Sequence, residues 1–367
     1  MGDALTILHT ESSMNMGGQE LRILMEMEGL KGRGYNSVLA ARPGSRILGE
    51  AVGRGLKAYP VGMRGSIDPA AVSAFARIIS REKADIVNAH GSKDGWSAGI
   101  AARLLGKKVV RSRHIANPIR GSFFGRLVYG PLCDRIMTTS ESIKRGIAEK
   151  GVAEGKILSI PTGVDTSRFH PGVDGSSFRA ELGIKGSSPL VGMVSVMRGD
   201  KGPDVFFKSA EAVLGRMPEA YFVLVGDGWM KGRLEDMASA SPYRERIRLT
   251  GYRRDIPSVL AALDLMVLPA LVPEGIPQAV LQAHAMKVPV VASDVGGINE
   301  VAINGSTAVC VPPGDEAALA DAIVMLLKDT EMAATLSSAG YGLVMERYTL
   351  PGMLDRVDAF YRDVVRG

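Results

Sequence analysis

Short apolar runs alternate along the chain with longer stretches in which apolar residues recur at helical spacing. In the first half, the apolar runs lie at residues 4–9, 37–41, 86–90, 108–111, 135–139 and 156–160. Stretches with helical spacing lie between them, for example at residues 68–82 and 95–105. This alternation predicts parallel strands joined by crossover helices, which is the pattern of a doubly wound α/β sheet.

The alternation stops at residues 170–177, a polar segment rich in turn-forming residues, and then begins again. Apolar runs return at residues 190–196, 220–225, 247–249, 265–268 and 288–292. The last stretch, residues 350–365, has the spacing of an amphipathic helix, which either covers the second half or returns to the first. We therefore expect a Rossmann-like domain at residues 1–170, a linker at 171–187, a second Rossmann-like domain at 188–348 and a C-terminal helix at 349–367.

Length and composition agree with this two-domain prediction. The chain has 367 residues, 46% of them hydrophobic and 23% charged, and a single core seldom grows beyond ~250–300 residues. The net charge of +5 suits a phosphate-rich ligand or an anionic membrane but is too small to indicate nucleic acid. Cys133 and Cys310 form no CxxC pair, so we expect neither a disulfide framework nor a cysteine metal site.

We expect a cytoplasmic protein, because the chain has neither an apolar run of membrane-spanning length nor a signal-peptide pattern. Residues 111–135 combine arginines with apolar residues. They include Arg111, Arg113, Arg120, Arg126 and Arg135, interleaved with Phe123, Phe124, Leu127, Val128 and Tyr129. This segment either lies on the inner face of an anionic membrane and receives a lipid-linked acceptor, or is an ordinary helix that buries its apolar side.

Two loops that follow predicted strands carry features of anion sites. Ligands of open parallel sheets bind where the strands end. Gly17-Gly18 opens a helix whose backbone N–H groups suit an anion, although a plain tight turn is the simpler interpretation because the full GxGxxG pattern is absent. Arg198 and Lys201 follow the first strand of the second half, where two cations suit a diphosphate; the alternative is a solvated loop.

A third loop, at residues 270–285, combines a glutamate, a glycine and a glutamine. Glu274 can accept hydrogen bonds from sugar hydroxyls, and Gly275 lets the backbone approach a ligand. Gln282 lies eight residues further on, about two helical turns, so we expect it on the same side as Glu274. The combination predicts a nucleotide-sugar site; the alternative is a capped amphipathic helix with Gln282 exposed. The Gly-rich loop at residues 293–300 is a weaker signal.

Nearly the whole chain resembles the retaining glycosyltransferases of family 4, which have the GT-B fold. The resemblance rests on Gly17-Gly18, Ile160–Asp165, Lys201-Gly202, Val225–Gly228, Leu249–Tyr252, the E-x7-E-like segment from Leu268 to Gln282, and the loop Pro289–Gly297. It implies two Rossmann-like α/β domains that face a cleft, with an acceptor bound by the first domain, a nucleotide-sugar bound by the second, and a C-terminal helix that crosses back to the first.

The resemblance also implies roles for particular residues. Arg198 and Lys201 would hold the donor diphosphate and stabilise it as it leaves. Glu274 would contact the donor sugar, Gln282 the ribose, and His114 the transferred sugar from the first domain. The other residues implied in donor binding are Gly17, Gly18, Gly226, Tyr252, Gly275, Ile276, Pro277 and Gln278.

Three positions depart from the family pattern. Gln282 replaces the second glutamate, Arg198 precedes Lys201 by three residues where five are usual, and Pro277 stands where glycine is common. A glutamine can still both accept and donate hydrogen bonds at the ribose. The form EGIPQAxLQA is similar to that of bacterial cell-surface and lipopolysaccharide glycosyltransferases.

The function expected from these features is transfer of a sugar from a nucleoside-diphosphate sugar to a hydroxyl group, with retention at C1. We expect UDP in preference to GDP or ADP, and a glycan or lipid-linked acceptor. The chain has no D-x-D pair, so a metal-independent mechanism is expected. Two alternatives remain open: a nucleotide-sugar 2-epimerase of the same fold, and a non-catalytic nucleotide-sugar binding protein in which Gln282 marks lost activity.

Overall fold

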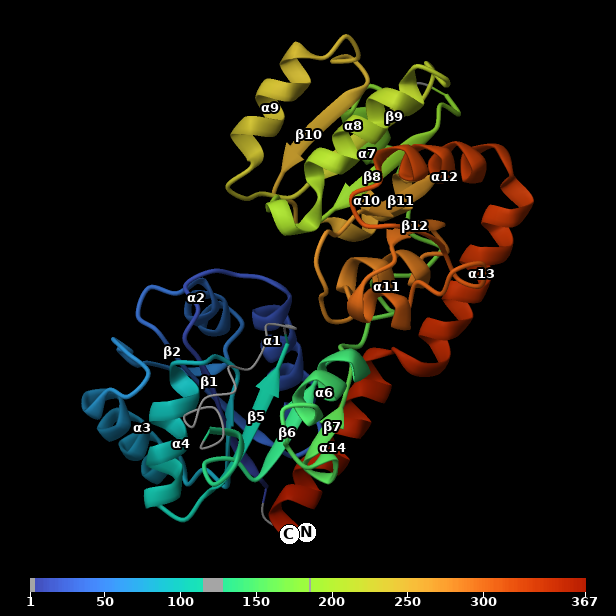
Figure 1. Cartoon of the computed structure of the whole chain (residues 1–367). Coiled ribbons are helices and arrows are strands. Elements are labelled where there is room, and N and C mark those ends of the chain that lie inside the picture. The colour runs from blue at the N-terminus through green and yellow to red at the C-terminus, as the bar shows by residue number, and fades with distance from the viewer. Residues whose placement is uncertain (1–3, 115–127, 185) are drawn as a thin grey trace. The chain divides into compact units, whose positions relative to one another are not determined.

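Residues 4–114, 128–184 and 186–367 are described by a computed structural model of the chain. Their contacts separate into two units (Figure 1). The first unit comprises residues 1–162 together with 351–367, and the second comprises residues 163–350. The chain therefore enters the second unit once and returns to the first at its carboxyl end.

The first unit is built on a parallel sheet. Its described strands are β1 (Thr6–Glu11), β2 (Asn36–Ala41), β3 (Lys57–Pro60), β4 (Ile86–Ala89), β5 (Lys108–Arg113), β6 (Arg135–Thr138) and β7 (Ile157–Ser159). They lie in the order β3-β2-β1-β4-β5-β6-β7, and every pair is parallel. The described helices are α1 (Gly18–Lys31), α2 (Arg46–Gly53), α3 (Pro69–Glu82), α4 (Asp94–Leu104), α6 (Glu141–Ala148) and, at the end of the chain, α14 (Leu350–Arg366).

Alternate side chains of these strands enter different cores on the two faces of the sheet. Leu8 and Val87 pack with α3 and α4, whereas Leu39 and Ala41 pack with α1 and α2. Because successive side chains of a strand point to opposite faces, two apolar layers form from near-continuous apolar runs. The predicted doubly wound sheet is confirmed.

The C-terminal helix α14 packs in the first unit, as expected for a helix that crosses back. All of its apolar stripe is buried: Met353, Leu354, Val357, Phe360, Tyr361 and Val364. The Tyr361 hydroxyl donates to Glu26 on α1 at 2.5 Å and accepts from the Asn88 amide on β4 at 2.7 Å. The helix is therefore held by hydrogen bonds as well as by apolar contact.

The second unit repeats the same architecture. Its described strands are β8 (Leu190–Val194), β9 (Tyr221–Val225), β10 (Ile247–Gly251), β11 (Leu265–Leu268), β12 (Val290–Ser293) and β13 (Val309–Val311), in the order β10-β9-β8-β11-β12-β13, all parallel. Its helices are α7 (Ser176–Glu181), α8 (Pro203–Leu214), α9 (Lys231–Ala240), α10 (Ile256–Ala262), α11 (Gln278–Ala285), α12 (Glu316–Lys328) and α13 (Thr330–Arg347).

The two faces of this second sheet are also covered by helices. Helices α8, α9 and α12 pack on one face, where Phe222 and Val267 are buried, and α10 and α11 pack on the other with Val223 and Met266. The segment 171–187, expected as a linker, includes helix α7 and brings apolar residues into this second core. Phe178, Leu182 and Ile184 are all buried there.

Replacing Tyr361 by phenylalanine should destabilise the protein by about 1–3 kcal/mol, because the buried Glu26 and Asn88 side chains each lose a hydrogen-bond partner. Urea denaturation measures this change. The control is Tyr341→Phe, since Tyr341 is only half-buried on α13. Equal midpoints for the two variants would show that the Tyr361 hydroxyl does not hold α14.

Candidate functional site

Strand order in the second unit brings two predicted loops together. The order reverses between β8 and β11, which are adjacent although two strands separate them in sequence. Chain connections leave these two strands towards opposite sides at such a point, and ligands bind there at the carboxyl ends. The Arg198–Lys201 loop follows β8 and the Glu274 loop follows β11.

Three contacts join these loops. The Lys201 ammonium forms an ion pair with the Glu274 carboxylate. The Leu271 N–H donates to the Asp200 carbonyl at 2.9 Å. Gly202 has φ +67°, and a Cβ there would lie 2.0 Å from the Pro269 carbonyl oxygen, so only glycine permits this approach. Two of the residues expected to act on the donor, Lys201 and Glu274, are thus in direct contact.

The Glu274 carboxylate is held in place but keeps acceptor capacity. Its side chain is 19% exposed, and its Oε1 atom is buried without a hydrogen-bond partner among the described residues. The loop at residues 293–300 holds the backbone of Glu274. The Gly297 N–H donates to the Glu274 carbonyl at 2.8 Å, and a Cβ on Gly296 would lie 2.9 Å from the Glu274 nitrogen. A buried, unpaired carboxylate oxygen is costly unless a ligand donates to it.

The segment after Glu274 is less helical than the sequence suggested. Helix α11 begins only at Gln278, with Pro277 as its N-cap, so Gly275, Ile276 and Pro277 are loop residues. The eight residues from Glu274 to Gln282 do not form the two helical turns expected, because Pro277 has extended backbone angles, φ −75° and ψ 124°, and the helix begins after it. That Gln282 lies on the same side as Glu274 stays a prediction. Gln282 itself is half-buried on α11.

Gln278 presents a second unpaired acceptor. Its Nε2 donates to the Gly163 carbonyl at 3.2 Å, which orients the amide. Its Oε1 is buried and lacks a partner among the residues described. The family resemblance implied Gln278 in donor binding, and the unpaired side-chain oxygen is an independent observation at the same residue.

The Arg198 side chain pairs with a residue of its own loop, whereas Lys201 pairs with Glu274. Its guanidinium bonds Asp200 at 2.9 Å, and its side chain is 50% exposed. Gly226 has φ +145°, and a Cβ there would lie 1.9 Å from the Ser195 carbonyl oxygen, so this glycine lets the β9 and β8 loops pack together. Tyr252, just after β10, is 64% exposed.

In the first unit, Gly17 and Gly18 begin helix α1, as expected. The Gly17 N–H, however, already donates to the Glu20 carboxylate at 2.8 Å. Glu11 lies nearby at the end of β1, where it accepts from the Ser13 N–H at 2.7 Å. The Gly17 N–H is therefore already used by Glu20 and is not available to an anion in this structure.

His114 is not isolated but is the end of a chain of three histidines. Its Nε2 lies 3.0 Å from Nδ1 of His90, and Nε2 of His90 lies 3.1 Å from Nδ1 of His9. Burial, with the charges of Arg22 and Arg113, lowers the pKa of His114 to about 3. Burial likewise lowers the pKa of His90, well below its usual value, and that of His9.

Sequence reasoning missed His9 and His90. His9 lies within β1 and His90 directly after β4, the two adjacent strands between which the first sheet has its own reversal of strand order. That position was the available signal, since each histidine is the last residue of an apolar run that was predicted as a strand.

A buried carboxyl pair also lies at this edge. Glu11 and Asp94 are 1% and 0% exposed, and Thr10 donates to Asp94 at 2.7 Å. Burial, followed by the neighbouring Asp94, raises the pKa of Glu11 to about 8. The Glu11 side chain can therefore hold a proton near neutral pH.

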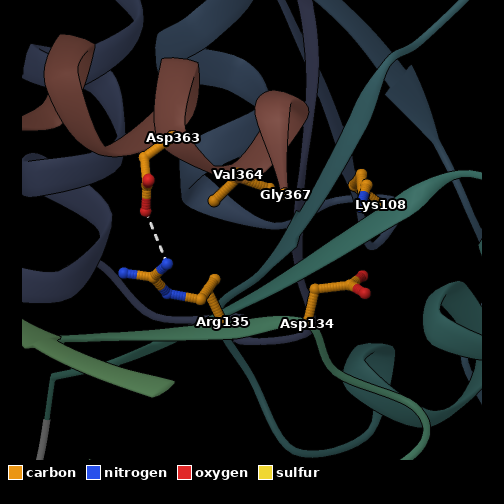
Figure 2. A pocket seen from close by; sticks show the side chains of 6 residues that line it. All are labelled: Lys108, Asp134, Arg135, Asp363, Val364 and Gly367. Atoms are coloured by element: carbon orange, nitrogen blue, oxygen red, sulfur yellow. Dashed lines mark hydrogen bonds and ion pairs between the residues drawn. The ribbon is translucent and has the colours of Figure 1, made fainter. Parts of the chain in front are cut away.

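The remaining features lie away from the carboxyl ends of the strands or outside the residues that the structure describes. A pocket of about 250 Å³ lies at the opposite, amino-terminal edge of the first sheet, beside the Arg135–Asp363 ion pair at 2.5 Å (Figure 2). Among the described residues, no group of three or more His, Cys, Asp and Glu side chains could hold a metal ion. None of the described helices is both long and apolar enough to cross a bilayer. Residues 115–127, the centre of the predicted membrane segment with Arg120 and Arg126, lie outside the described residues.

Two parallel α/β units, each with polar loops at the carboxyl edge of its sheet, define a two-domain enzyme of the GT-B type. The protein-family model described as "Glycosyltransferase Family 4" matches residues 16–168 of the chain. The model described as "Glycosyl transferases group 1" matches residues 188–329. The structure of a glycosyltransferase from Rickettsia africae ESF-5 superposes with a TM-score of 0.91 at 21% identity, covering 100% of both chains. The chain is a GT-B glycosyltransferase, with a family 4 domain followed by a group 1 domain.

Two named relatives are bacterial glycosyltransferases. The UDP-Gal:alpha-D-GlcNAc-diphosphoundecaprenol alpha-1,3-galactosyltransferase of Escherichia coli is 28% identical over 317 residues, which cover 81% of this chain and 80% of that protein. The lipopolysaccharide core biosynthesis mannosyltransferase LpsB of Rhizobium meliloti (strain 1021) is 29% identical over 211 residues, covering 56% of this chain and 60% of its own.

Replacing Glu11 by glutamine should change how stability depends on pH. A raised carboxyl pKa means that the folded state binds the proton more tightly, so this contribution is complete below about 4.5 and is lost as the pH rises to about 8. The melting temperature of Glu11→Gln relative to wild type should therefore rise between pH 5 and pH 9. The exposed Glu346→Gln is the control; parallel curves for Glu11→Gln and wild type would contradict the raised pKa.

Proposed function

We propose that this glycosyltransferase moves a sugar from a nucleoside-diphosphate sugar to a hydroxyl acceptor with retention at C1, in the synthesis of a bacterial lipopolysaccharide or other cell-surface glycan. The observation that carries the proposal is the Lys201–Glu274 pair at the reversal of strand order in the second sheet. It combines a cation for a diphosphate with a carboxylate oxygen that has no partner among the described residues.

The two residues of the pair bind different parts of the donor. Lys201 neutralises the diphosphate, and its contact with Glu274 fixes where that charge lies. Glu274 Oε1 accepts a hydrogen bond from a hydroxyl of the sugar, with the backbone of Gly275, Ile276 and Pro277 alongside. The free Gln278 Oε1 offers a second acceptor near the same loop.

The remaining donor contacts follow from the family resemblance. Gln282 bonds the ribose, Arg198 releases Asp200 and reaches the diphosphate, and Gly226 and Tyr252 border the nucleotide. From the first unit, Gly18 offers its backbone N–H group to the diphosphate, with Gly17 beside it at the start of α1, and His114 contacts the transferred sugar. UDP is the favoured nucleotide, which agrees with the UDP-galactose in the name of the Escherichia coli relative.

The chemistry is a substitution at C1. The bond from C1 to the phosphate oxygen breaks as the acceptor oxygen bonds to C1 on the same face, and the acceptor proton passes to the departing phosphate. The charge that develops on the diphosphate is stabilised by Lys201, Arg198 and the N-terminal turn of α8, so the mechanism we propose needs no metal ion.

The acceptor is a glycan or a lipid-linked sugar bound by the first unit. The Escherichia coli relative is named for a diphosphoundecaprenol-linked acceptor. Within the segment 111–135 the residues Arg111, Val128 and Tyr129 are buried. The membrane contact we propose therefore rests on the sequence of the remaining residues, in which Arg120 and Arg126 flank Phe123 and Phe124. We therefore place the enzyme in the cytoplasm, in peripheral contact with the inner face of the cytoplasmic membrane.

Incubation of the enzyme with UDP-, GDP- and ADP-sugars and a set of lipid-linked and glycan acceptors tests this function. Release of the nucleoside diphosphate together with a new α-glycoside is the expected result. A changed sugar-nucleotide without a glycoside would indicate an epimerase, and binding without turnover would indicate a sensor.

Two single substitutions separate the roles in the Glu274 loop. Glu274→Ala should lower transfer by at least about a hundredfold, because it removes a sugar contact and leaves Lys201 without its partner. Gln282→Glu should keep most of the activity, since a carboxylate can also accept from ribose hydroxyls. Initial rates of glycoside formation measure both; an inactive Gln282→Glu enzyme would refute the ribose assignment.

A further inference from the structure

Three histidines of the first unit, His9, His90 and His114, form a chain in which Nδ1 of one ring is hydrogen-bonded to Nε2 of the next. The His9–His90 link joins Nδ1 to Nε2, and the His90–His114 link again joins Nδ1 to Nε2. The ring planes of each pair are close to parallel, 18° apart in the first pair and 28° in the second, with centroids 5.4 Å and 5.3 Å apart, so the rings meet edge to edge through their nitrogens. His9 and His90 are 0% and 5% exposed, so neither can reach a substrate directly.

These histidines are neutral at physiological pH, because burial lowers the pKa of each. A neutral imidazole has one N–H group and one nitrogen lone pair. His90 uses both of its nitrogens in the chain, so it must donate at one link and accept at the other.

This requirement couples the three tautomers. If His114 donates through Nε2, then His90 accepts at Nδ1 and carries its own proton on Nε2. His90 then donates to Nδ1 of His9, whose proton is likewise on Nε2. If the hydrogen bonds are donated in the opposite direction, from His9 towards His114, all three protons lie on Nδ1. The three rings therefore always share one tautomer.

We propose that His90 and His9 are positioning residues that fix the ring orientation and the tautomer of His114. They thereby decide whether Nδ1 of His114 offers an N–H group or a lone pair to a hydroxyl of the sugar. This inference rests on the proposed function in the assignment of His114 to the transferred sugar.

The surroundings of the chain keep its members from rotating. His90 is held through both of its ring nitrogens, by His9 at one end and by His114 at the other. His9 lies on β1 opposite Asn88 of β4, and Asn88 is bonded to both Tyr361 and Ser112. The Nε2 atom of His9 is buried without a partner among the described residues, so the chain ends there, and His114 is its other end.

Nitrogen-15 NMR of the histidine side chains at pH 8 tests the coupling without any substrate. The chain contains five histidines, and the other two provide internal references. His170 accepts from the Gly172 N–H at Nδ1, and His284 donates from Nε2 to the Val301 carbonyl, so both are Nε2–H tautomers. We expect His9, His90 and His114 to share one tautomer, and a mixture among them would overturn the proposal.

Two replacements of His90 separate positioning from simple packing. Asparagine places a polar atom near the Nδ1 position and keeps the contact with His114, whereas glutamine places one near Nε2 and keeps only the contact with His9. Loss of one positioning hydrogen bond should lower kcat of His90→Gln by roughly tenfold, with His90→Asn at least about threefold more active than His90→Gln. Equal kcat values in two variants of equal melting temperature would overturn the proposal.

His114→Ala distinguishes this inference from the proposed function. If His114→Ala transfers sugar as fast as wild type, the assignment of His114 to the sugar is wrong, and the positioning proposal falls with it. If His114→Ala is impaired but the two His90 variants are equal, only the positioning proposal is wrong. Impairment of His114→Ala together with the expected order of the His90 variants supports both.

Discussion

Parallel pairing of the strands is the constraint on which the rest of this structure depends. A parallel strand must be reached by a crossover, so every loop that leaves a strand at its carboxyl end gathers at one edge of the sheet. In the second unit this brings together Lys201 and Glu274, which lie 73 residues apart in sequence. In the first unit the same constraint brings together His9, His90 and His114 from three strands. Both candidate sites are therefore consequences of strand order.

Both units bury polar groups near the carboxyl ends of their strands. In the first unit Tyr361, Glu26 and Asn88 form a bonded network and the histidines form a chain, but the Nε2 atom of His9 and the Oδ1 atom of Asp94 are buried without a hydrogen-bond partner among the described residues. In the second unit, Glu274 and Gln278 each keep a buried oxygen without a partner among the described residues. Unpaired buried acceptors are costly. We assign the sugar of the donor to the second unit because there the carboxylate with the unpaired oxygen also contacts Lys201, at the reversal of strand order.

Much of the fold could be predicted from the sequence, because buried parallel strands read as apolar runs and the helices between them carry a helical period. Strands β3 and β13 were missed, since both are short edge strands, and Lys57–Pro60 is largely exposed. The start of the second unit could not be predicted from the sequence either. Phe178, Leu182 and Ile184 pack in its core, but they belong to a segment whose first residues are turn-forming and which was therefore expected to be a linker. At the site, motif order identified Lys201 and Glu274, whereas their ion pair and the histidine chain depend on which strands are adjacent. The two helical turns expected between Glu274 and Gln282 were wrong because Pro277 is the N-cap of α11, so the helix begins only at Gln278.

Calorimetric titration of UDP and UDP-galactose tests most directly whether the Lys201–Glu274 pair holds the donor. The wild-type protein and two variants, Lys201→Met and Glu274→Gln, are compared under the same conditions. The account predicts that Lys201→Met binds UDP at least about tenfold more weakly, as expected for loss of a charged contact to phosphate. It also predicts that Glu274→Gln binds UDP as wild type does but loses the additional affinity contributed by the sugar. Wild-type affinity for both ligands in both variants would contradict the account.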